Sequence, residues 1–199
     1  MERLKDIALE VADAKGIVRW RDFFARGVTP ATIARMIQSG DLERVGRGLY
    51  RQPTFVASEH QSIVETAKAS PLGIICLLSA LRYHDLTDQL PHAVWMMIGG
   101  KDRSPKAAGV RLKIVRASGP ALTEGVVRKQ IDGVEVAMTT PAKTVADCFK
   151  YRGRVGVDVA IEALRQGLAR KAFSTDDFLR MAVIDRAARI ARPYLEAMV

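Results

Sequence analysis

Residues 21–51 read RDFFARGVTPATIARMIQSGDLERVGRGLYR, and this stretch decides the fold of the N-terminal part of the chain. It opens with a short amphipathic segment that ends at Gly27, a residue type that adopts the left-handed conformation found just after helices. Thr29-Pro30 follows as a helix start, because threonine caps free N–H groups and proline suits the first helical position. The stretch therefore predicts two short helices joined by a tight turn.

The second of these helices is predicted to have one apolar and one polar face. Ile33, Met36 and Ile37 recur at spacings of three and four, which is typical of a face that packs on a core. The other face is predicted to carry Thr32, Arg35, Gln38 and Ser39. Arginine and glutamine can make paired hydrogen bonds with guanine and adenine edges, so this face is a candidate for base recognition.

A basic hairpin is predicted after this helix. Gly40 ends the helix, residues 42–45 and 49–51 have strand composition, and Gly46-Arg47-Gly48 makes a tight turn between them. Before the stretch, residues 2–14 have helical periodicity, and residues 17–20 are predicted to form a short strand that pairs with the hairpin. This order of elements is that of a winged helix-turn-helix, whose second helix enters the major groove of DNA.

The residues predicted to contact DNA lie on this helix, at its ends and on the wing. They are Thr29, Thr32, Arg35, Gln38, Ser39, Arg44, Arg47 and Arg51. The alternative is a small helical subdomain whose exposed arginine and glutamine side chains are only solvated.

The composition favours a folded protein with an anionic partner. The chain has 199 residues, 48% of them hydrophobic, and a net charge of +9. This length suits one large or two small domains, and the charge is typical of nucleic-acid binding. Much of the positive charge lies in residues 101–129, which hold eight basic and two acidic residues. The basic residues are Lys101, Arg103, Lys106, Arg111, Lys113, Arg116, Arg128 and Lys129.

These eight residues are a candidate second basic surface. Three interpretations of this surface are open: a second nucleic-acid contact, a docking face for an acidic partner, or a solvated face that aids solubility.

Pro53 marks the predicted boundary between two domains, because proline interrupts strand pairing. Residues 1–53 form the predicted winged helix-turn-helix, and residues 54–199 a mixed α/β domain with a small sheet and several helices. The fold class is therefore α+β. In the second domain we expect strands over 93–98 and 110–114, and a hairpin of 126–131 with 134–139 around Asp132-Gly133.

Helices are also expected in the second domain. They are predicted over residues 58–69, capped by Ser58, over a buried stretch at 74–83, after Thr140-Pro141, over 156–170, and over 175–197, with Ser174 as cap and a break near Pro193. In the helix after Thr140-Pro141, residues 142, 145, 146 and 149 form the apolar face. Lys143 and Lys150 lie off that face.

No motif in the sequence predicts an enzyme. Lys143-Thr144 lacks the preceding glycines of a phosphate-binding loop, and CxxC, HExxH and GxSxG are absent. The three histidines, His60, His84 and His92, are not expected to bind a metal. No cofactor and no catalytic residue is predicted. A less favoured hypothesis is a nucleic-acid-processing enzyme that uses His84, Asp85 and Asp88.

The cysteines and the apolar segments predict a cytoplasmic protein. Cys76 and Cys148 lie in separate apolar runs, which is typical of buried, reduced cysteines. The N-terminus has no signal-peptide pattern, and no apolar stretch is long enough to span a bilayer.

Four blocks of the chain carry a resemblance to a known family. They are GRGLYRQP (46–53), PLGIICLLSALRYHDLTDQLPHAVWMMI (71–98), TTPAKTVADCFKYRGRVGVDVAIEALRQGLARK (139–171) and RPYLEAM (192–198). These blocks resemble the AbiEi antitoxins of bacterial type IV toxin–antitoxin systems, some of which are phage-defence loci.

The resemblance implies a winged helix that binds inverted repeats in the operon's own promoter and represses transcription. A palindromic operator would require two copies in two-fold relation on the DNA, which need not be dimeric beforehand. It also implies a C-terminal domain that counteracts a nucleotidyltransferase-like toxin without forming a stable complex with it. The alternative function is a protein-interaction module that directly binds and inhibits a toxin or another enzyme. No membrane partner is expected.

Overall fold

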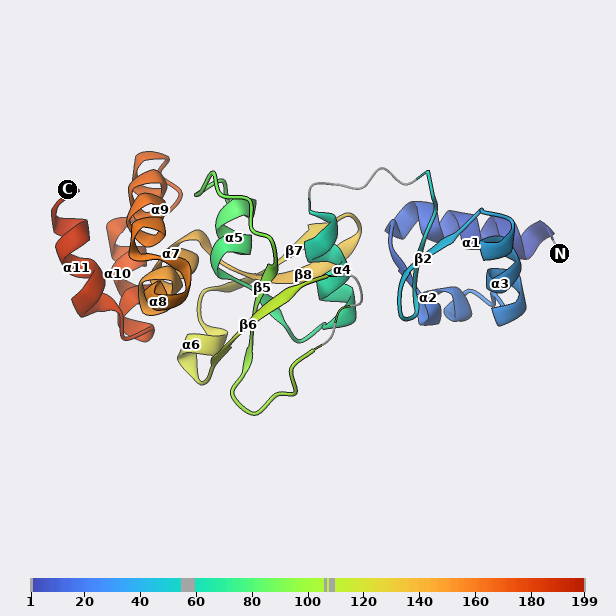
Figure 1. Ribbon diagram of the computed structural model, residues 1–199, viewed down its shortest axis with the longest axis horizontal. Coiled ribbons are helices and arrows are strands. Elements are labelled where there is room, and N and C mark those ends of the chain that lie inside the picture. The colour runs from blue at the N-terminus through green and yellow to red at the C-terminus, as the bar shows by residue number, and fades with distance from the viewer. Residues whose placement is uncertain (1, 55–59, 106, 108–109, 199) are drawn as a thin grey trace.

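The computed structural model describes residues 2–54, 60–105, 107 and 110–198. The molecule is elongated, with an N-terminal helical unit at one end, a five-stranded sheet in the middle and a layer of helices at the other end (Figure 1). The two termini lie at opposite ends. Helices and sheet strands are both present in the second unit, so the predicted α+β class is confirmed.

The N-terminal unit has the element order of a winged helix. It contains α1 (Glu2–Lys15), β1 (Val18–Arg19), α2 (Trp20–Ala25), α3 (Pro30–Gln38), β2 (Glu43–Gly46) and β3 (Leu49–Arg51). The three strands form an antiparallel sheet in the order β1-β3-β2, with Val18 opposite Tyr50. This pairing confirms that the segment around residues 17–20 closes the hairpin into a sheet. Phe23, Ile33 and Met36 lie in the core of the unit.

The second unit is built on a mixed sheet in the order β6-β5-β4-β8-β7. Its strands are β4 (Ile74–Ile75), β5 (Val94–Gly99), β6 (Leu112–Ala117), β7 (Val126–Ile131) and β8 (Val134–Thr139). β5 is parallel to β6 and β4 is parallel to β8, while the other neighbours are antiparallel. The hairpin β7–β8 has the predicted bounds, and the strand expected at 110–114 begins two residues later.

Both faces of this sheet are covered, because alternate side chains of a strand point to opposite faces. On β5, Trp95 and Met97 belong to a core shared with the C-terminal helices. Val94, Met96 and Ile98 belong to a second core that includes α4 (Gln61–Ala69). This is why residues 93–98 read as a continuous apolar run rather than an alternating one.

The C-terminal helices pack together on the face of the sheet opposite α4. They are α7 (Pro141–Lys150), α8 (Arg152–Val155), α9 (Val157–Ala169), α10 (Thr175–Ile184) and α11 (Ala188–Glu196), while the short α6 (Pro120–Thr123) connects β6 with β7. Ser174 and Asp177 form the predicted capping box at the start of α10. Helix α7 lies at the centre of this layer, in contact with α9 and α10.

Two predicted helices differ from the observed ones. Ile74–Ile75 form a strand, because Met96 and Met97 of β5 pair with them, and α5 (Leu77–Tyr83) begins only after this strand. The break in the last helical segment occurs at Asp185–Ala187, where Arg186 adopts a φ of 57°, and Pro193 lies inside α11. Helix α4 begins at Gln61, and the predicted cap Ser58 lies outside the described residues.

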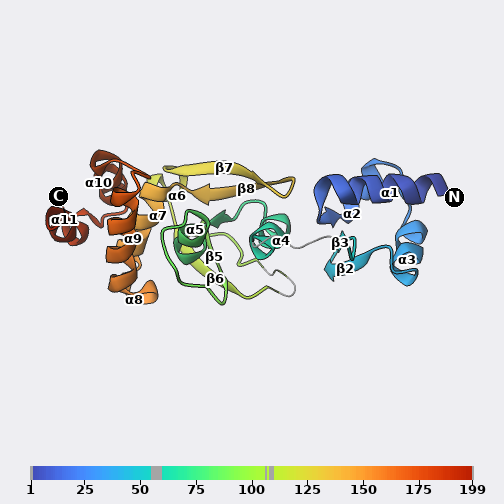
Figure 2. The ribbon, with the colours of Figure 1, turned by 90° about the horizontal axis from the view of Figure 1, so that it is seen from above.

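The N-terminal unit and the second unit contact each other through apolar and polar groups. Ile17 and Leu49 are buried in the same core as Ile63 of α4. The turn of the β7–β8 hairpin points at the N-terminal unit (Figure 2). A Cβ added at Gly133 in this turn would lie 2.9 Å from the carbonyl oxygen of Ala14. The turn therefore requires glycine both for its φ of 69° and for this close approach.

Candidate nucleic-acid interface

Helix α3 is closed at both ends by local hydrogen bonds. The Oγ1 atom of Thr29 accepts a hydrogen bond from the backbone N–H of Thr32 at 3.3 Å, and Pro30 occupies the first helical position. At the other end, Gly40 has a φ of 78° and the N–H of Leu42 donates to the carbonyl of Met36 at 3.0 Å. These are the predicted start and stop signals, and they fix the orientation of the helix.

Burial divides α3 into two faces, with two differences from the prediction. Ile33 and Met36 are buried as expected. Thr32 was predicted on the polar face, but it is only 5% exposed, and its Oγ1 lies 2.9 Å from that of Thr29. The reason is that it lies in the first turn, beside Ile33 and four residues before Met36, and faces the same core. Ile37 was predicted to face the core but is 38% exposed.

The outward face of α3 therefore carries Arg35 and Gln38. Both side chains are exposed, and the Nε atom of Arg35 donates to the carbonyl of Ala31 at 3.2 Å. The hydroxyl of Ser39, also predicted to contact DNA, donates to the carbonyl of Met36 at 3.3 Å and to the carboxylate of Asp41. Ser39 thus helps to close the helix, and Arg35 and Gln38 are the side chains presented to solvent.

Asp41 ties the end of α3 to α1. Its carboxylate lies 2.8 Å from the Nζ atom of Lys5. The hydrogen bond from Lys5, supported by that from Ser39, lowers the pKa of the Asp41 carboxyl below its ordinary value. The orientation of the recognition helix is thereby linked to the first helix of the unit.

The three predicted wing arginines have different surroundings. Arg51 forms an ion pair with Glu43 across the hairpin and is partly buried. The Nε atom of Arg44 donates to the carbonyl of Gly46 at 3.1 Å, and its side chain is exposed. Arg47 lies in the turn between the strands, is exposed, and precedes Gly48, whose φ is 70°. The ion pair assigns Arg51 a structural contact within the wing.

The tip of the wing lies beside the second unit. Arg47 lines a cavity of about 670 Å³ together with Leu49 and with Pro105, Val110 and Leu112 of the second unit. The backbone N–H of Trp20 donates to the carbonyl of Gly48 at 3.0 Å and holds the turn against the start of α2. The wing therefore faces both solvent and the segment that connects β5 with β6.

The basic segment 101–129 is divided by the fold. β6 and β7 form opposite edges of the five-stranded sheet, so the basic residues of β6 are separated from Arg128 and Lys129 of β7. Arg116 donates from its Nη1 atom to three backbone carbonyls between residues 99 and 102 and thus orders the preceding loop. The Nζ atom of Lys113 lies 4.7 Å from the ring centre of Trp95. Lys106 lies outside the described residues.

Arg128 has a different environment from the rest of the segment. Its Nη1 atom lies 2.6 Å from a carboxylate oxygen of Glu135, on the neighbouring strand. Lys101, Arg103, Arg111 and Lys129 have exposed side chains. The described residues of this segment are therefore spread over several surfaces and do not form one continuous basic face, and a nucleic-acid contact by them stays a prediction.

A buried charge cluster in the second unit was missed by the sequence analysis. Lys143 was placed off the apolar face of its helix, but its side chain is fully buried. Its Nζ atom lies 2.6 Å from Asp147 Oδ1 and 2.9 Å from both carboxylate oxygens of Asp185. The i, i+4 spacing of Lys143 and Asp147 was a signal of their pairing. Asp185, which lies 42 residues after Lys143, could not be assigned from spacing.

The cluster joins α7 to the junction between α10 and α11. Burial raises the pKa of Asp147 to about 7; the charge of Lys143 opposes this shift and that of Asp185 adds to it. The buried Lys143 ammonium thus faces two buried carboxyl groups, and the partly exposed Lys150 ammonium lies 3.5 Å from Asp185 as well. Since the side chains of Lys143, Asp147 and Asp185 are inaccessible to solvent, the cluster positions helices and presents no group to a substrate.

The remaining candidates for chemistry also have structural surroundings. The Nε2 atom of His84 lies 2.8 Å from the carbonyl oxygen of Thr139, and burial lowers the pKa of this histidine. Cys76 and Cys148 are both buried and unbridged, as predicted, and burial raises the pKa of each thiol. Within the described ranges, no group of three or more His, Cys, Asp or Glu side chains is arranged to hold a metal ion. No helix in the described part of the chain is long and apolar enough to cross a membrane.

Comparison with known proteins identifies the N-terminal unit. Residues 5–53 match the family model described as "Transcriptional regulator, AbiEi antitoxin". The N-terminal unit is similar to this family and is called the AbiEi unit from here on. The match spans all of the elements from α1 to β3 except the first residues of α1, and it confirms the resemblance to AbiEi antitoxins over this part of the chain. The AbiEi family is one of DNA-binding antitoxin regulators and not a family of enzymes.

A solved structure has the same fold as the whole chain, AbiEi unit included. The crystal structure of the RV2827C protein from Mycobacterium tuberculosis aligns with a TM-score of 0.65 over 100% of this chain and 81% of that one. The sequences are 12% identical, so the likeness concerns the fold alone. No curated protein matches this chain in sequence.

Proposed function

We propose that this chain is an autorepressing antitoxin that binds inverted repeats in its own promoter through the AbiEi unit. The observation that carries the proposal is the exposed pair Arg35 and Gln38 on a helix capped at both ends, within a unit that matches the AbiEi regulators. Helix α3 enters the major groove and these two side chains read bases. A promoter-binding role also places the protein in the cytoplasm.

The second unit, in this proposal, counteracts a nucleotidyltransferase-like toxin encoded beside the antitoxin gene, without forming a stable complex. The support for this part is the resemblance of residues 71–98 and 139–171 to AbiEi antitoxins. Co-expression of the toxin with the full chain, with a full chain that carries Arg35→Ala and Gln38→Ala, or with no antitoxin tests it. Rescue of growth by both full-length chains is the expected result, because the substitutions leave the second unit intact. Co-purification of the toxin with the antitoxin at stoichiometric amounts would instead favour a protein-interaction module.

The DNA-binding part is tested by a salt-titrated fluorescence anisotropy assay. The probe is the duplex upstream of the gene, and the control is a scrambled duplex of equal length and composition. We expect the native duplex to bind at least tenfold more tightly, a difference of about 1.4 kcal/mol. Equal binding to both duplexes, lost at high salt, would mean that the positive charge gives only non-specific binding and would contradict the proposal.

Substitution of Arg47 distinguishes a phosphate contact of the wing from base recognition by α3. In the proposal its guanidinium group contacts a phosphate, so Arg47→Ala is expected to weaken binding to both duplexes and to reduce the slope of log K against log salt by about 1. Lys171→Ala is the matched control, because Lys171 is exposed on the second unit. An Arg47→Ala protein with unchanged affinity and slope would remove the wing from the DNA interface.

A further inference from the structure

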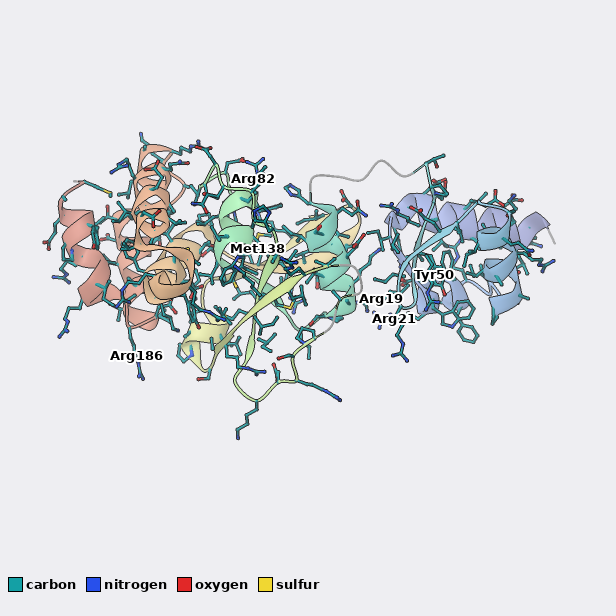
Figure 3. All side chains as sticks on the ribbon, in the orientation of Figure 1. Arg19, Arg21, Tyr50, Arg82, Met138 and Arg186 are labelled. Carbon is teal, nitrogen blue, oxygen red and sulfur yellow. The ribbon has the colours of Figure 1, made fainter. Side chains whose placement is uncertain are left out.

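A small basic cavity lies between the AbiEi unit and the second unit. Its volume is about 260 Å³, and residues of α4 and of the β7–β8 hairpin line it together with residues of the AbiEi unit. The cationic side chains in its lining are Lys15, Arg19, Arg21, Lys68 and Arg128. Figure 3 shows Arg19 and Arg21 on the side of the AbiEi unit that faces α4.

The two carboxylates in the lining are already engaged. Asp22 lies 2.8 Å from the Nζ atom of Lys15, and Glu135 lies 2.6 Å from Arg128. Among the described residues, neither Arg19 nor Arg21 forms an ion pair within 4.0 Å. The lining therefore has an excess of positive charge, and no carboxylate of the described residues forms an ion pair with Arg19, Arg21 or Lys68.

Lys68 has the least favourable environment of these cations. Its side chain is 7% exposed, and its Nζ atom donates to the backbone carbonyl of Lys15 at 3.3 Å. Burial lowers its pKa to about 7; Asp22 and Asp132 oppose that shift, while Lys15 and Arg19 add to it. An ammonium group in such a site is costly unless an anion accompanies it.

The chemistry of the lining selects the class of anion. Arginine forks and a lysine ammonium on different sides of one small cavity are the groups that proteins use to bind phosphate oxygens. The volume is below the 300–1,000 Å³ typical of sites for drug-sized ligands, so it suits a phosphate group with a small substituent. We propose that this cavity binds the phosphate group of a small phosphorylated ligand.

A phosphate bound here would bridge the two units. Arg19 and Lys15 belong to the AbiEi unit, whereas Lys68 belongs to α4 and Arg128 to β7. The cationic side chains on the two sides of the cavity repel each other. A bound phosphate neutralises this charge, so its binding draws the two units together. The ligand thereby sets the position of the recognition helix relative to the second unit. This inference does not depend on the proposed promoter binding, because the cavity is defined without DNA.

Isothermal titration of the full chain with inorganic phosphate tests the site, in a chloride buffer of constant ionic strength. We expect one saturable site. Lys68→Gln and Arg19→Gln each remove one cation from the lining and are expected to weaken the affinity at least tenfold. Arg189→Gln, which removes the same charge from the exposed face of α11, is the matched control and is expected to bind as the unsubstituted chain does.

Arg128→Gln is the second variant, in case substitution of the buried Lys68 impairs folding. Arg128 is exposed on a strand, so its loss is expected to leave the melting temperature without phosphate nearly unchanged and to reduce the rise in melting temperature that phosphate produces. Non-saturable heats, or equal losses in all four variants, would show that phosphate acts only as a general electrolyte and would overturn the proposal.

A backbone phosphate of DNA has the same chemistry as the phosphate of a small ligand. Binding of duplex DNA to the same variants distinguishes these two sources of phosphate. If inorganic phosphate does not bind but Lys68→Gln weakens duplex binding, the cavity receives the DNA backbone and the small-ligand proposal fails. If phosphate binds as expected while the promoter duplex binds no better than its scrambled control, the cavity proposal stands and the proposed promoter recognition fails. The two proposals therefore fail separately.

Discussion

Helices α3 and α7 begin with the same two residues and have opposite surroundings. Thr29-Pro30 and Thr140-Pro141 each cap a helix, and in each the threonine Oγ1 accepts the N–H of the residue three positions on, at 3.3 and 3.4 Å. The helices are nine and ten residues long. Yet α3 buries three residues and α7 buries eight. The Thr-Pro start of a helix therefore does not predict whether its polar side chains are buried or exposed.

The position of each helix in the fold explains the difference. Helix α3 covers one side of a small core and leaves Arg35 and Gln38 in solvent. Helix α7 lies between α9 and α10 on the sheet, so Lys143 and Asp147 have no route to water. In α3 polar groups remain available for a partner, whereas in α7 they must satisfy each other. Four experiments test this contrast, in order of decreasing expected effect.

The largest loss of stability is expected from substitution of Lys143. Lys143→Met leaves Asp147 buried without its cation and Asp185 with Lys150 alone, and loss of one partner from a buried charge cluster costs about 3–5 kcal/mol in the free energy of unfolding. Arg35→Met on α3 is the matched change and is expected to cost less than about 0.5 kcal/mol. Urea denaturation of both variants measures the difference. Similar small losses at the two positions would contradict the contrast between the helices.

The next effect concerns DNA discrimination by α3. Arg35→Ala and Gln38→Ala are each expected to reduce the preference for the native promoter duplex over the scrambled one by about 1–3 kcal/mol, since bidentate base contacts are lost. Lys171→Ala removes an exposed lysine from the second unit and is the control. Anisotropy titrations at fixed salt give the values. A uniform loss on both duplexes would assign Arg35 and Gln38 to phosphate contacts instead.

A smaller effect is expected from pH. The pKa of Asp147 is about 7 in the folded chain, above its ordinary value of 3.8, so the folded state binds more protons than the unfolded state between those pH values. Asp147 therefore makes the chain less stable as pH rises from about 4 to about 7, by at most about 1.4 kcal/mol per pH unit for one proton.

Asp147→Asn is expected to remove this contribution, because the amide does not titrate and its oxygen still accepts from Lys143. The difference in free energy of unfolding between the variant and the unsubstituted chain should grow with pH over this interval. A constant difference from pH 4.5 to 7 would show that Asp147 has an ordinary pKa in the folded chain.

The smallest effect is expected from the shared cap itself. Thr29→Ala and Thr140→Ala each remove one capping oxygen, which costs about 1 kcal/mol. The loss at Thr29 is expected to be the larger by up to about 1 kcal/mol, because the Oγ1 atom of Thr29 also lies 2.9 Å from that of the buried Thr32. Thr→Ser at each position retains the oxygen and is the control. A much larger loss at Thr140 would mean that the capping threonine of α7 also has a packing role that its counterpart in α3 lacks.

Local signals explain what the sequence predicted well. Gly27 and Thr29-Pro30 fix the turn between α2 and α3, and Asp132-Gly133 fixes the β7–β8 hairpin, because each acts through residues within a few positions. The polar pair Arg35 and Gln38 was found in the same way, from spacing along one helix.

Features that depend on distant residues were predicted wrongly or missed. Ile74–Ile75 is a strand only because Met96, Met97 and Met138 pair with it. Thr32 is buried because the core behind α3 extends to the first turn. Lys143 is buried because Asp185 meets it from another helix. The basic cavity at Lys68 requires the approach of two units that no spacing in the sequence reveals.

The burial of Ile17 and Leu49 in the core beneath α4 has a consequence for modularity. A fragment cut after residue 53 would expose both side chains, which are 1% and 7% accessible in the whole chain. Such a fragment would have an exposed apolar surface and would self-associate. Recombination therefore cannot move the AbiEi unit alone into another protein without a further change. The new protein must supply an apolar surface that covers these two side chains, or both must be replaced by polar residues.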